Sequence, residues 1–240
     1  MNLDDAVVVV TGASSGIGAA TARAAAGRGA RVVLAARRQR RIADLAEELG
    51  RAVAVRCDVT DPAQVATLVR SAVDAFGRID VVVNNAGQGH EGDVDQIALD
   101  DFRALLELNL VAPLSVMQAV LPVMRAQGAG SIVNVSSGTT FADVPGTGAY
   151  VASKIALERL SAIARAELDG TGITVSTVIP FATSTEFVSS LRAGRQRAEA
   201  GLAGVALDRP EQVAEVILGL VQSGDAQADL VPAAYGGSRR

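Results

Sequence analysis

The chain has little of what secreted proteins or polyanion-binding proteins use. It contains one cysteine, Cys57, in 240 residues, which excludes an internal disulfide, and the apolar run around it indicates a buried core residue. Acidic residues outnumber basic ones, 26 to 22, and the arginines are scattered among them. No basic face long enough to follow a nucleic acid or an anionic lipid surface is therefore expected.

Targeting signals and metal-ligating clusters are also missing from the sequence. The first five residues, MNLDD, are acidic and lead directly into a predicted strand, which is not the pattern of a signal peptide. No apolar stretch reaches the roughly 18 residues that a membrane-spanning helix needs. These absences predict a cytoplasmic protein with no metal site, no membrane partner and no nucleic-acid partner.

Apolar residues, in contrast, make up 49% of the chain, which is enough for one α/β domain with a substantial core. Short apolar runs alternate with longer amphipathic segments, a pattern that predicts buried parallel strands alternating with helices. The expected fold is a doubly wound parallel sheet of the Rossmann type, with three α/β/α layers in a single domain over residues 1–240. The predicted strands cover residues 6–10, 32–36, 52–57, 81–83, 132–135, 173–179 and 228–231, and the predicted helices cover 17–27, 38–49, 62–76, 101–127, 150–168 and 210–221.

The segment 181–208 interrupts this alternation. It is rich in Ser, Thr, Arg and Ala and contains no predicted strand. We interpret it as a lid over the substrate site. His90, the only histidine, follows the fourth predicted strand and is expected to be a solvated loop residue.

The strongest local motif follows the first predicted strand. The sequence TGASSGIG places three glycines between that strand and a helix. Glycines allow a tight turn and let backbone N–H groups approach a pyrophosphate at the helix N-terminus, where the macrodipole favours an anion. We therefore predict a dinucleotide-binding loop formed by Gly12, Ser14, Ser15, Gly16, Ile17 and Gly18.

The end of the second predicted strand indicates which dinucleotide binds. An NAD site of this architecture has an acidic residue here, which accepts hydrogen bonds from the ribose hydroxyls. This chain has Ala36 at that position, followed by Arg37 and Arg38. A guanidinium group suits a 2′-phosphate, and Ser14 offers a further donor. Cations are unfavourable at a helix start unless an anion joins them, so the pattern predicts NADP(H) as the cofactor.

Tyr150 and Lys154 form the candidate reactive pair. They lie four residues apart at the start of a predicted helix, which places them on one helix face. An adjacent ammonium favours the phenolate, so it is expected to lower the Tyr150 pKa from its usual value of about 10 toward neutral. Lys154 is the only lysine among 22 basic residues, and a compact ammonium is not interchangeable with a guanidinium. The pair is therefore predicted to hold and transfer a proton.

Together these motifs resemble the short-chain dehydrogenase/reductase family. The G-x-x-x-G-x-G spacing, the N-N-A-G turn after the fourth predicted strand and the Y-x-x-x-K pair follow the family's order, and the resemblance covers residues 6 to about 222. It implies an oxidoreductase that transfers a hydride between NADP(H) and a carbonyl or secondary alcohol, with Tyr150 as the general acid/base.

The resemblance also implies roles for further residues. Ser137 donates a hydrogen bond to the substrate oxygen, Lys154 holds the nicotinamide ribose as well as tuning Tyr150, and Asn109 holds a water beside the lysine. Ser136 is expected to face the opposite side of its strand from Ser137. The remaining cofactor contacts implied are Asp58 and Val59 at the adenine, Asn85, Ala86 and Gly87 beside the ribose, and Pro180, Thr183 and Thr185 after the sixth strand.

Two departures from the family pattern leave the substrate and the assembly open. Phe181 stands where glycine is usual, and its ring is expected near the nicotinamide wall, where it narrows the substrate pocket or repositions the lid. The ending Ala234-Tyr235-Gly236-Gly237 replaces the usual Asp-Gly-Gly in a region that often packs between subunits. The expected partners are a small carbonyl or alcohol and further copies of the chain, as a homodimer or homotetramer.

Two alternative functions remain open at this point. The first is a 3-oxoacyl thioester reductase, in which the lid arginines Arg192, Arg195 and Arg197 meet an acyl carrier protein. The second is a non-catalytic NADP(H)-binding regulatory protein. Loss of one of the four residues Asn109, Ser137, Tyr150 and Lys154 would favour the second alternative, and all four are present.

Overall fold

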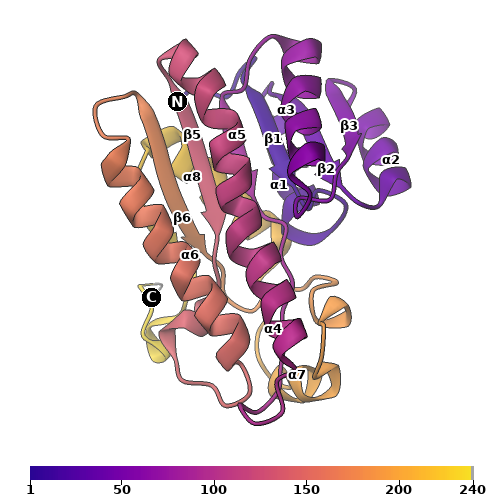
Figure 1. Cartoon of the computed structure of the whole chain (residues 1–240), viewed down its shortest axis with the longest axis vertical. Coiled ribbons are helices and arrows are strands. Elements are labelled where there is room, and N and C mark those ends of the chain that lie inside the picture. The colour runs from indigo at the N-terminus through magenta and orange to yellow at the C-terminus, as the bar shows by residue number, and fades with distance from the viewer. Residues whose placement is uncertain (239–240) are drawn as a thin grey trace.

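The computed structural model describes residues 1–238 and contains one seven-stranded sheet with the strand order β3-β2-β1-β4-β5-β6-β7. All neighbouring strands pair in parallel, and helices lie along the sheet as Figure 1 shows. The predicted doubly wound α/β fold is confirmed. The strands are β1 (Val7–Thr11), β2 (Arg31–Ala36), β3 (Ala52–Arg56), β4 (Val81–Asn84), β5 (Gly130–Val135), β6 (Ile173–Ile179) and β7 (Gln227–Asp229).

Helices pack on both faces of the sheet. Side chains of α1, α2 and α8 form one buried cluster with the strands, and side chains of α3 and α5 form a second cluster on the opposite face, joined by partly buried residues of α6. The helices are α1 (Gly16–Ala26), α2 (Gln39–Leu49), α3 (Pro62–Phe76), α4 (Leu99–Leu106), α5 (Ala112–Gln127), α6 (Gly148–Glu167), α7 (Arg195–Gly201) and α8 (Pro210–Ser223).

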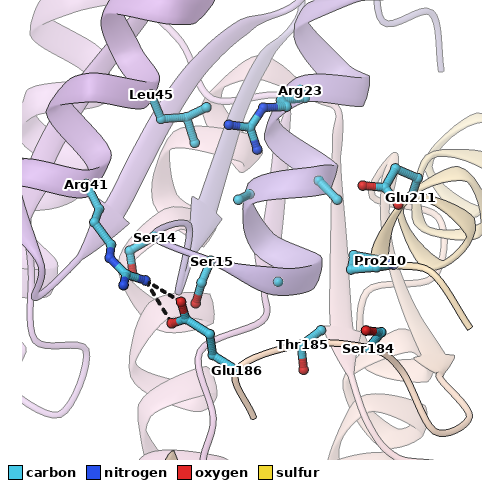
Figure 2. Close-up of a pocket in the computed structure, with 13 residues that line it drawn as sticks. Ser14, Ser15, Arg23, Arg41, Leu45, Ser184, Thr185, Glu186, Pro210 and Glu211 are labelled. Atoms are coloured by element: carbon cyan, nitrogen blue, oxygen red, sulfur yellow. Dashed lines mark hydrogen bonds and ion pairs between the residues drawn. The ribbon is translucent and has the colours of Figure 1, made fainter. Parts of the chain in front are cut away.

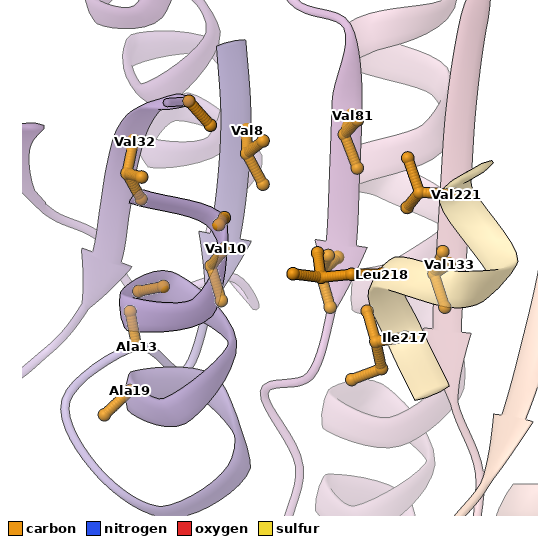
Figure 3. Close-up of a cluster of buried hydrophobic side chains, with 14 of the residues drawn as sticks. Val8, Val10, Ala13, Ala19, Val32, Val81, Val133, Ile217, Leu218 and Val221 are labelled. Atoms are coloured by element: carbon orange, nitrogen blue, oxygen red, sulfur yellow. The ribbon is translucent and has the colours of Figure 1, made fainter. Parts of the chain in front are cut away.

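The central strands are buried on both faces. In β1, Val8 and Val10 belong to the cluster under α1 and α8, whereas Val7 and Val9 belong to the cluster under α3 and α5. Successive strand residues point to opposite faces, so a strand covered on both sides is a continuous apolar run. Figure 3 shows the first cluster, with Leu218 of α8 packed among the valines.

The helix predicted over residues 101–127 is longer than expected and is interrupted. It begins as α4, passes through a π-helical turn at Glu107–Val111 and continues as α5. The sequence pattern predicted one continuous α-helix over this stretch, and no residue type in it indicates where the π-helical turn occurs. Such turns are rare and occur often at functional sites. This one carries Asn109.

The same stretch also passes a composition test for a membrane span. By length and composition only, Leu99–Gln127 is long and apolar enough to cross a membrane, with a mean hydropathy of 1.7. The expectation that no apolar stretch reaches this length is wrong by that criterion. A single such helix is weak evidence, because core helices of soluble proteins pass the same test. One face of α5 is buried against the sheet through Val116, Val120 and Met124.

The segment 181–208 contains helical structure that the sequence pattern did not predict. A 3-10 turn covers Val188–Ser190 and α7 covers Arg195–Gly201. As expected, residues 181–208 form no strand. Their one β-type pairing is an isolated bridge between Thr183 and Asp208. Figure 1 shows α7 near the end of the molecule where α4 begins.

This segment is hydrogen-bonded to the loop that follows β4. The Arg192 N–H donates to the Gly89 carbonyl at 3.0 Å, and the Glu91 N–H donates to the Ala193 carbonyl at 3.1 Å. The two bonds flank His90, which is 3% exposed. The expectation that His90 is a solvated loop residue is therefore wrong, because the segment covers this loop.

Candidate active site

The glycine loop joins β1 to α1 at the point where the strand order reverses between β1 and β4, which is where open α/β sheets bind their ligands. A Cβ atom on Gly18 would lie 2.5 Å from Asn85 Nδ2 and 2.6 Å from the Gly12 carbonyl oxygen. A Cβ atom on Gly12 would lie 2.9 Å from the Ala86 Cα atom. The glycines are therefore required for close contact between the loop and the turn after β4.

The N-terminus of α1 is open to an anion. Its N-cap residue, Ser15, makes no side-chain hydrogen bond to the first turn, and that turn contains no acidic residue. The first N–H groups of a helix have no partner within the helix, and the macrodipole favours negative charge there. Ile17 lies in this first turn. The donor set fits the pyrophosphate of a dinucleotide.

The turn after β4 is fixed against β1 by Thr11. The backbone N–H groups of Asn85 and Ala86 donate to Thr11 Oγ1 at 3.0 and 3.1 Å, and Asn85 Nδ2 donates to the Thr11 carbonyl at 2.9 Å. Gly87 is the next residue of this turn. The predicted residues Asn85 and Ala86 are thus brought next to the glycine loop.

A cationic cluster lies beside the loop. Arg38 Nε donates to Ser14 Oγ at 2.9 Å, and the Arg38 guanidinium also contacts Ser15 Oγ. Glu186, from the segment after β6, accepts from Arg38 at 2.7 Å and from Arg41 at 2.7 and 2.8 Å. The two guanidinium groups, with Arg38 first, hold the pKa of the Glu186 carboxyl below its usual range. The cluster thus already binds one anionic group of this chain.

Figure 2 shows Arg41 and Glu186 of this cluster among the residues that line a cavity of about 530 Å³, together with Ser14, Ser15 and Thr185. The sequence predicted Arg37, Arg38 and Ser14 as donors to a 2′-phosphate, and in the structure Arg38 is the arginine that bonds Ser14. Arg37 is exposed, and its guanidinium makes no hydrogen bond or ion pair within residues 1–238, although its carbonyl accepts from the Gln39 N–H at 3.1 Å. Arg41 was missed as a candidate, although it lies on the first turn of α2 beside Arg38 and Arg37.

Tyr150 and Lys154 lie together in the first two turns of α6. Both are buried, with 8% and 5% of their surfaces exposed, and Lys154 Nζ lies 5.9 Å from the centroid of the Tyr150 ring. Lys154 Nζ donates to the carbonyl oxygen of Val135, the last residue of β5, at 2.8 Å. The predicted pair is therefore brought to the carboxyl end of the sheet.

Ser137 follows β5 and caps the 3-10 turn Gly138–Phe141. Its hydroxyl accepts hydrogen bonds from the Thr139 N–H at 3.3 Å and from Thr139 Oγ1 at 3.0 Å, and its side chain is also hydrogen-bonded to Tyr150. Ser136 instead donates to a Glu158 carboxylate oxygen on α6. The two serines thus face different neighbours, as strand alternation predicts.

Asn109 is fully buried in the π-helical turn. Its Oδ1 accepts from the Gln88 N–H at 3.0 Å, and its Nδ2 donates to the Gln88 carbonyl at 2.9 Å and to Ser153 Oγ at 3.0 Å. A Cβ atom on Gly87 would lie 3.2 Å from Asn109 Oδ1 and 3.5 Å from Lys154 Nζ. Asn109 and Lys154 therefore converge on Gly87.

The other predicted cofactor residues follow β3 and β6. Asp58 follows β3, and its Oδ1 accepts from the N–H and the hydroxyl of Thr60 at 3.1 and 2.8 Å. Val59 is buried among the side chains of the α3 face. The Pro180 carbonyl accepts from the Gly138 N–H at 2.7 Å. Asp58 and Val59 are placed by β3, and Pro180 is placed by β6.

Comparison with known proteins shows the family to which the chain belongs. The family model described as short chain dehydrogenase matches residues 6–196. The chain belongs to the short-chain dehydrogenase family. It is 38% identical to "Oxidoreductase BOA17" of Botryotinia fuckeliana (strain B05.10) over 183 residues, which cover 75% of this chain and 67% of that protein.

Two solved structures show how this dehydrogenase compares with cofactor complexes. A short-chain dehydrogenase/reductase from Burkholderia phymatum in complex with NAD matches with a TM-score of 0.91 and 25% identity, covering 98% of this chain and 92% of that one. The closed form of a serine dehydrogenase complexed with NADP+ matches with a TM-score of 0.88 and 26% identity, covering 95% of each chain. The family therefore binds a nicotinamide dinucleotide, and its members include complexes with either form.

Two phenylalanines of this dehydrogenase, both in the segment after β6, make contacts with tyrosine rings. The Phe181 ring packs against Tyr235, with the ring centroids 5.2 Å apart, and contacts the core cluster under α8. The ring thus packs beside the 3-10 turn Ala233–Tyr235, and its expected effect on the substrate pocket or the lid stays a prediction. Phe187, which sequence reasoning missed, lies 5.7 Å from the Tyr150 ring centroid.

Two further contacts hold the residues between these rings. Thr183 Oγ1 donates to the Phe181 carbonyl at 2.7 Å, and the Phe187 N–H donates to Thr185 Oγ1 at 3.2 Å. A Cβ atom on Gly16 would lie 3.0 Å from Thr185 Cγ2. Thr185 thus joins the segment after β6 to the glycine loop of this dehydrogenase.

Burial controls the titration of the reactive pair. It raises the pKa of the Tyr150 phenol to about 12, and the hydrogen bond with Ser137 opposes this only in part. Burial also lowers the pKa of Lys154 to about 8, against the opposing charge of Glu158. The expectation that Lys154 brings the Tyr150 pKa toward neutral is not met in the structure, because loss of hydration is the larger effect.

Proposed function

We propose that this dehydrogenase transfers a hydride between NADP(H) and a carbonyl or secondary alcohol, with Tyr150 as the general acid/base. The observation that supports it most directly is the convergence of Tyr150, Lys154 and Ser137 at the carboxyl end of β5, next to the glycine loop. The nicotinamide, when bound, supplies or accepts the hydride.

In the reducing direction, the Tyr150 hydroxyl gives its proton to the substrate oxygen. Ser137 holds that oxygen by a hydrogen bond, which strengthens as negative charge develops and so lowers the barrier. Lys154 stabilises the phenolate that remains, and Asn109 holds a water beside the lysine. Because burial, opposed only in part by Ser137, raises the Tyr150 pKa to about 12, added positive charge near the phenol is what makes the proton transfer feasible near neutral pH.

The preference for NADP(H) rests on charge at the end of β2. Ala36 provides no carboxylate to repel a 2′-phosphate, and Arg38 and Arg41 already hold a carboxylate beside Ser14. The proposed cofactor-binding set is Gly12, Ser14, Ser15, Gly16, Ile17, Gly18, Arg37, Arg38, Asp58, Val59, Asn85, Ala86, Gly87, Tyr150, Lys154, Pro180, Thr183 and Thr185. Michaelis constants for the two coenzymes test it, and a clear preference for NADH would refute it.

The substrate is proposed to be a small carbonyl or alcohol under the lid 181–208. Two of the lid arginines that would meet an acyl carrier protein are paired within the chain: Arg192 with Asp101 at 3.5 Å and Arg197 with Asp93 at 2.8 Å. Arg195 contacts the Ser189 carbonyl. These contacts favour a small free substrate over a carrier-bound thioester. Cytoplasmic localisation and a homodimer or homotetramer stay predictions.

The deciding experiment follows coenzyme oxidation against a panel of ketones, aldehydes, sugars and thioesters. Tyr150→Phe is expected to reduce turnover by about 100-fold or more, the usual contribution of a positioned acid. Tyr235→Phe changes the other tyrosine, which packs against Phe181, and is the matched control. Full turnover in Tyr150→Phe would remove Tyr150 from its role. Coenzyme binding without turnover of any carbonyl would favour the regulatory alternative.

A further inference from the structure

A third polar residue of α6 continues the face that carries the reactive pair. Glu158 lies four residues beyond Lys154 and eight beyond Tyr150 in the same helix, so the three side chains follow one another at successive turns. Ser136, which is 4% exposed, donates its hydroxyl hydrogen to a Glu158 carboxylate oxygen. The Ser136 N–H is itself fixed to the Val178 carbonyl at 2.8 Å. Glu158 is thereby tied to the end of β5.

Lys154 has few other polar neighbours. From β5 it is faced by the Val135 carbonyl, from the π-helical turn and its adjoining loop by Asn109 and the Gly87 backbone, and from its own helix by the Tyr150 ring and Glu158. Glu158 lies beyond ion-pair distance of Lys154 Nζ, but the two side chains bond neighbouring residues at the end of β5, Lys154 to Val135 and Glu158 to Ser136. The Glu158 charge opposes the lowering of the Lys154 pKa by burial. A buried ammonium without an opposite charge loses its proton readily.

We propose that Glu158 is a positioning residue that keeps Lys154 in its ammonium form and, through Ser136, holds α6 against the end of β5. The inference rests on the proposed role of Lys154 in the reaction. It adds a carboxylate that acts through Lys154 and Ser136.

The proposal predicts the direction in which the Lys154 pKa changes when the Glu158 charge is removed. Burial lowers the Lys154 pKa to about 8 and Glu158 raises it, so removing the carboxylate charge moves the pKa further down. Lys154 then becomes neutral at a lower pH, and the phenolate of Tyr150 loses its nearby positive charge. We expect Glu158→Gln to lower the Lys154 pKa by about one unit, a tenfold change in its ionisation constant.

The composition of the chain makes this measurable at one site. Because Lys154 is the only lysine, ¹³C-labelled lysine gives one side-chain signal, whose chemical shift can be followed with pH in the full chain without substrate. Glu167→Gln removes an exposed carboxylate from the same helix and is the control for net charge. Ser136→Ala keeps the carboxylate but removes its tether, so a smaller shift in the same direction is expected.

Two outcomes overturn the proposal. The first is a Lys154 pKa in Glu158→Gln that equals the value in Glu167→Gln. The second is an equal lowering of the Lys154 pKa in Glu158→Asp and Glu158→Gln, because the negative charge retained in Glu158→Asp should prevent part of that lowering. Circular dichroism identifies any variant that does not fold, in which case Ser136→Ala and Glu158→Asp carry the comparison.

Turnover supplies a second readout. In Glu158→Gln the alkaline limb of the pH profile for carbonyl reduction should move to lower pH by the same interval as the lysine titration, with kcat affected more than KM. A merely structural loss would reduce activity without moving the limb. If no carbonyl is reduced by the unmodified protein, the proposed function fails, whereas the lysine titration still decides the role of Glu158.

Discussion

The Phe187 ring lies against the Tyr150 ring, with centroids 5.7 Å apart and planes inclined by 52°. Phe187 belongs to the segment after β6, whereas Tyr150 belongs to α6. The proposed lid therefore contributes directly to the burial of the phenol, and this burial is the main cause of its high pKa. Removal of this ring is therefore expected to change the titration of Tyr150.

Phe187→Ala should lower the Tyr150 pKa. The substitution removes the aromatic cover and lets water reach the phenol, so the pKa should move from about 12 toward the ordinary value near 10. The chain has two tyrosines, so the absorbance of the phenolate is followed with pH in a Tyr235→Phe background.

Phe181→Ala is the matched control for this titration. The Phe181 ring contacts Tyr235 with a centroid distance of 5.2 Å, so its loss should leave the Tyr150 titration unchanged. An unchanged Tyr150 pKa in Phe187→Ala would mean that the surrounding helix and sheet, and not the lid, exclude water from the phenol.

Glu186→Gln should strengthen the binding of NADPH. In the structure the Glu186 carboxylate occupies the guanidinium groups of Arg38 and Arg41 at 2.7 Å, where the 2′-phosphate is proposed to bind. The Glu186 carboxylate and both guanidinium groups are about half exposed. Solvent therefore screens their attraction, and the expected gain in NADPH affinity is about two- to fivefold. NADH lacks the phosphate and should gain much less. Titration of coenzyme fluorescence measures both constants.

Asp93→Asn provides the same change in charge at another ion pair of the lid. Asp93 pairs with Arg197 of α7 at 2.8 Å, away from Arg38 and Arg41, so neither coenzyme should bind differently. Equal weakening of NADPH and NADH in Glu186→Gln would contradict competition. That result would indicate instead that Glu186 holds the lid closed over either coenzyme.

Local patterns were sufficient for most of the fold. The valine run of β1 is buried on both faces. The alternation of such apolar runs with amphipathic segments can be recognised from the sequence alone. The glycine loop and the Tyr150–Lys154 spacing are likewise local, because a turn and a single helix face fix them. These features could be predicted because each depends on residues within a few positions of one another.

Contacts between distant segments could not be predicted in this way. Glu186 and Arg41 are 145 residues apart, and their pairing depends on how the segment after β6 crosses the start of α2. The position of the Phe181 ring depends likewise on Tyr235 near the C-terminus. Burial of Tyr150 reverses the pKa direction expected from Lys154 alone, because desolvation is a property of the assembled core.

Gly18→Ala should weaken dinucleotide binding and destabilise the fold. The added methyl group would lie 2.5 Å from Asn85 Nδ2 and 2.6 Å from the Gly12 carbonyl oxygen, closer than real Cβ contacts allow, so the loop and the turn after β4 must separate. Such overpacking costs about 1–3 kcal/mol of unfolding free energy. Urea denaturation measures the loss of stability, and calorimetry with NADPH measures the loss of affinity.

Gly219→Ala is the control that separates this steric effect from the substitution itself. Gly219 lies within α8, and a Cβ atom there would meet no heavy atom within 4 Å. Alanine is a better helix former than glycine by about 1 kcal/mol, so this variant should be at least as stable as the unmodified chain and should bind NADPH equally well. If Gly18→Ala also bound NADPH with unchanged affinity, the contact between the glycine loop and Asn85 would not be what positions the dinucleotide. The proposed site would then have to depend on the N–H groups of α1 alone.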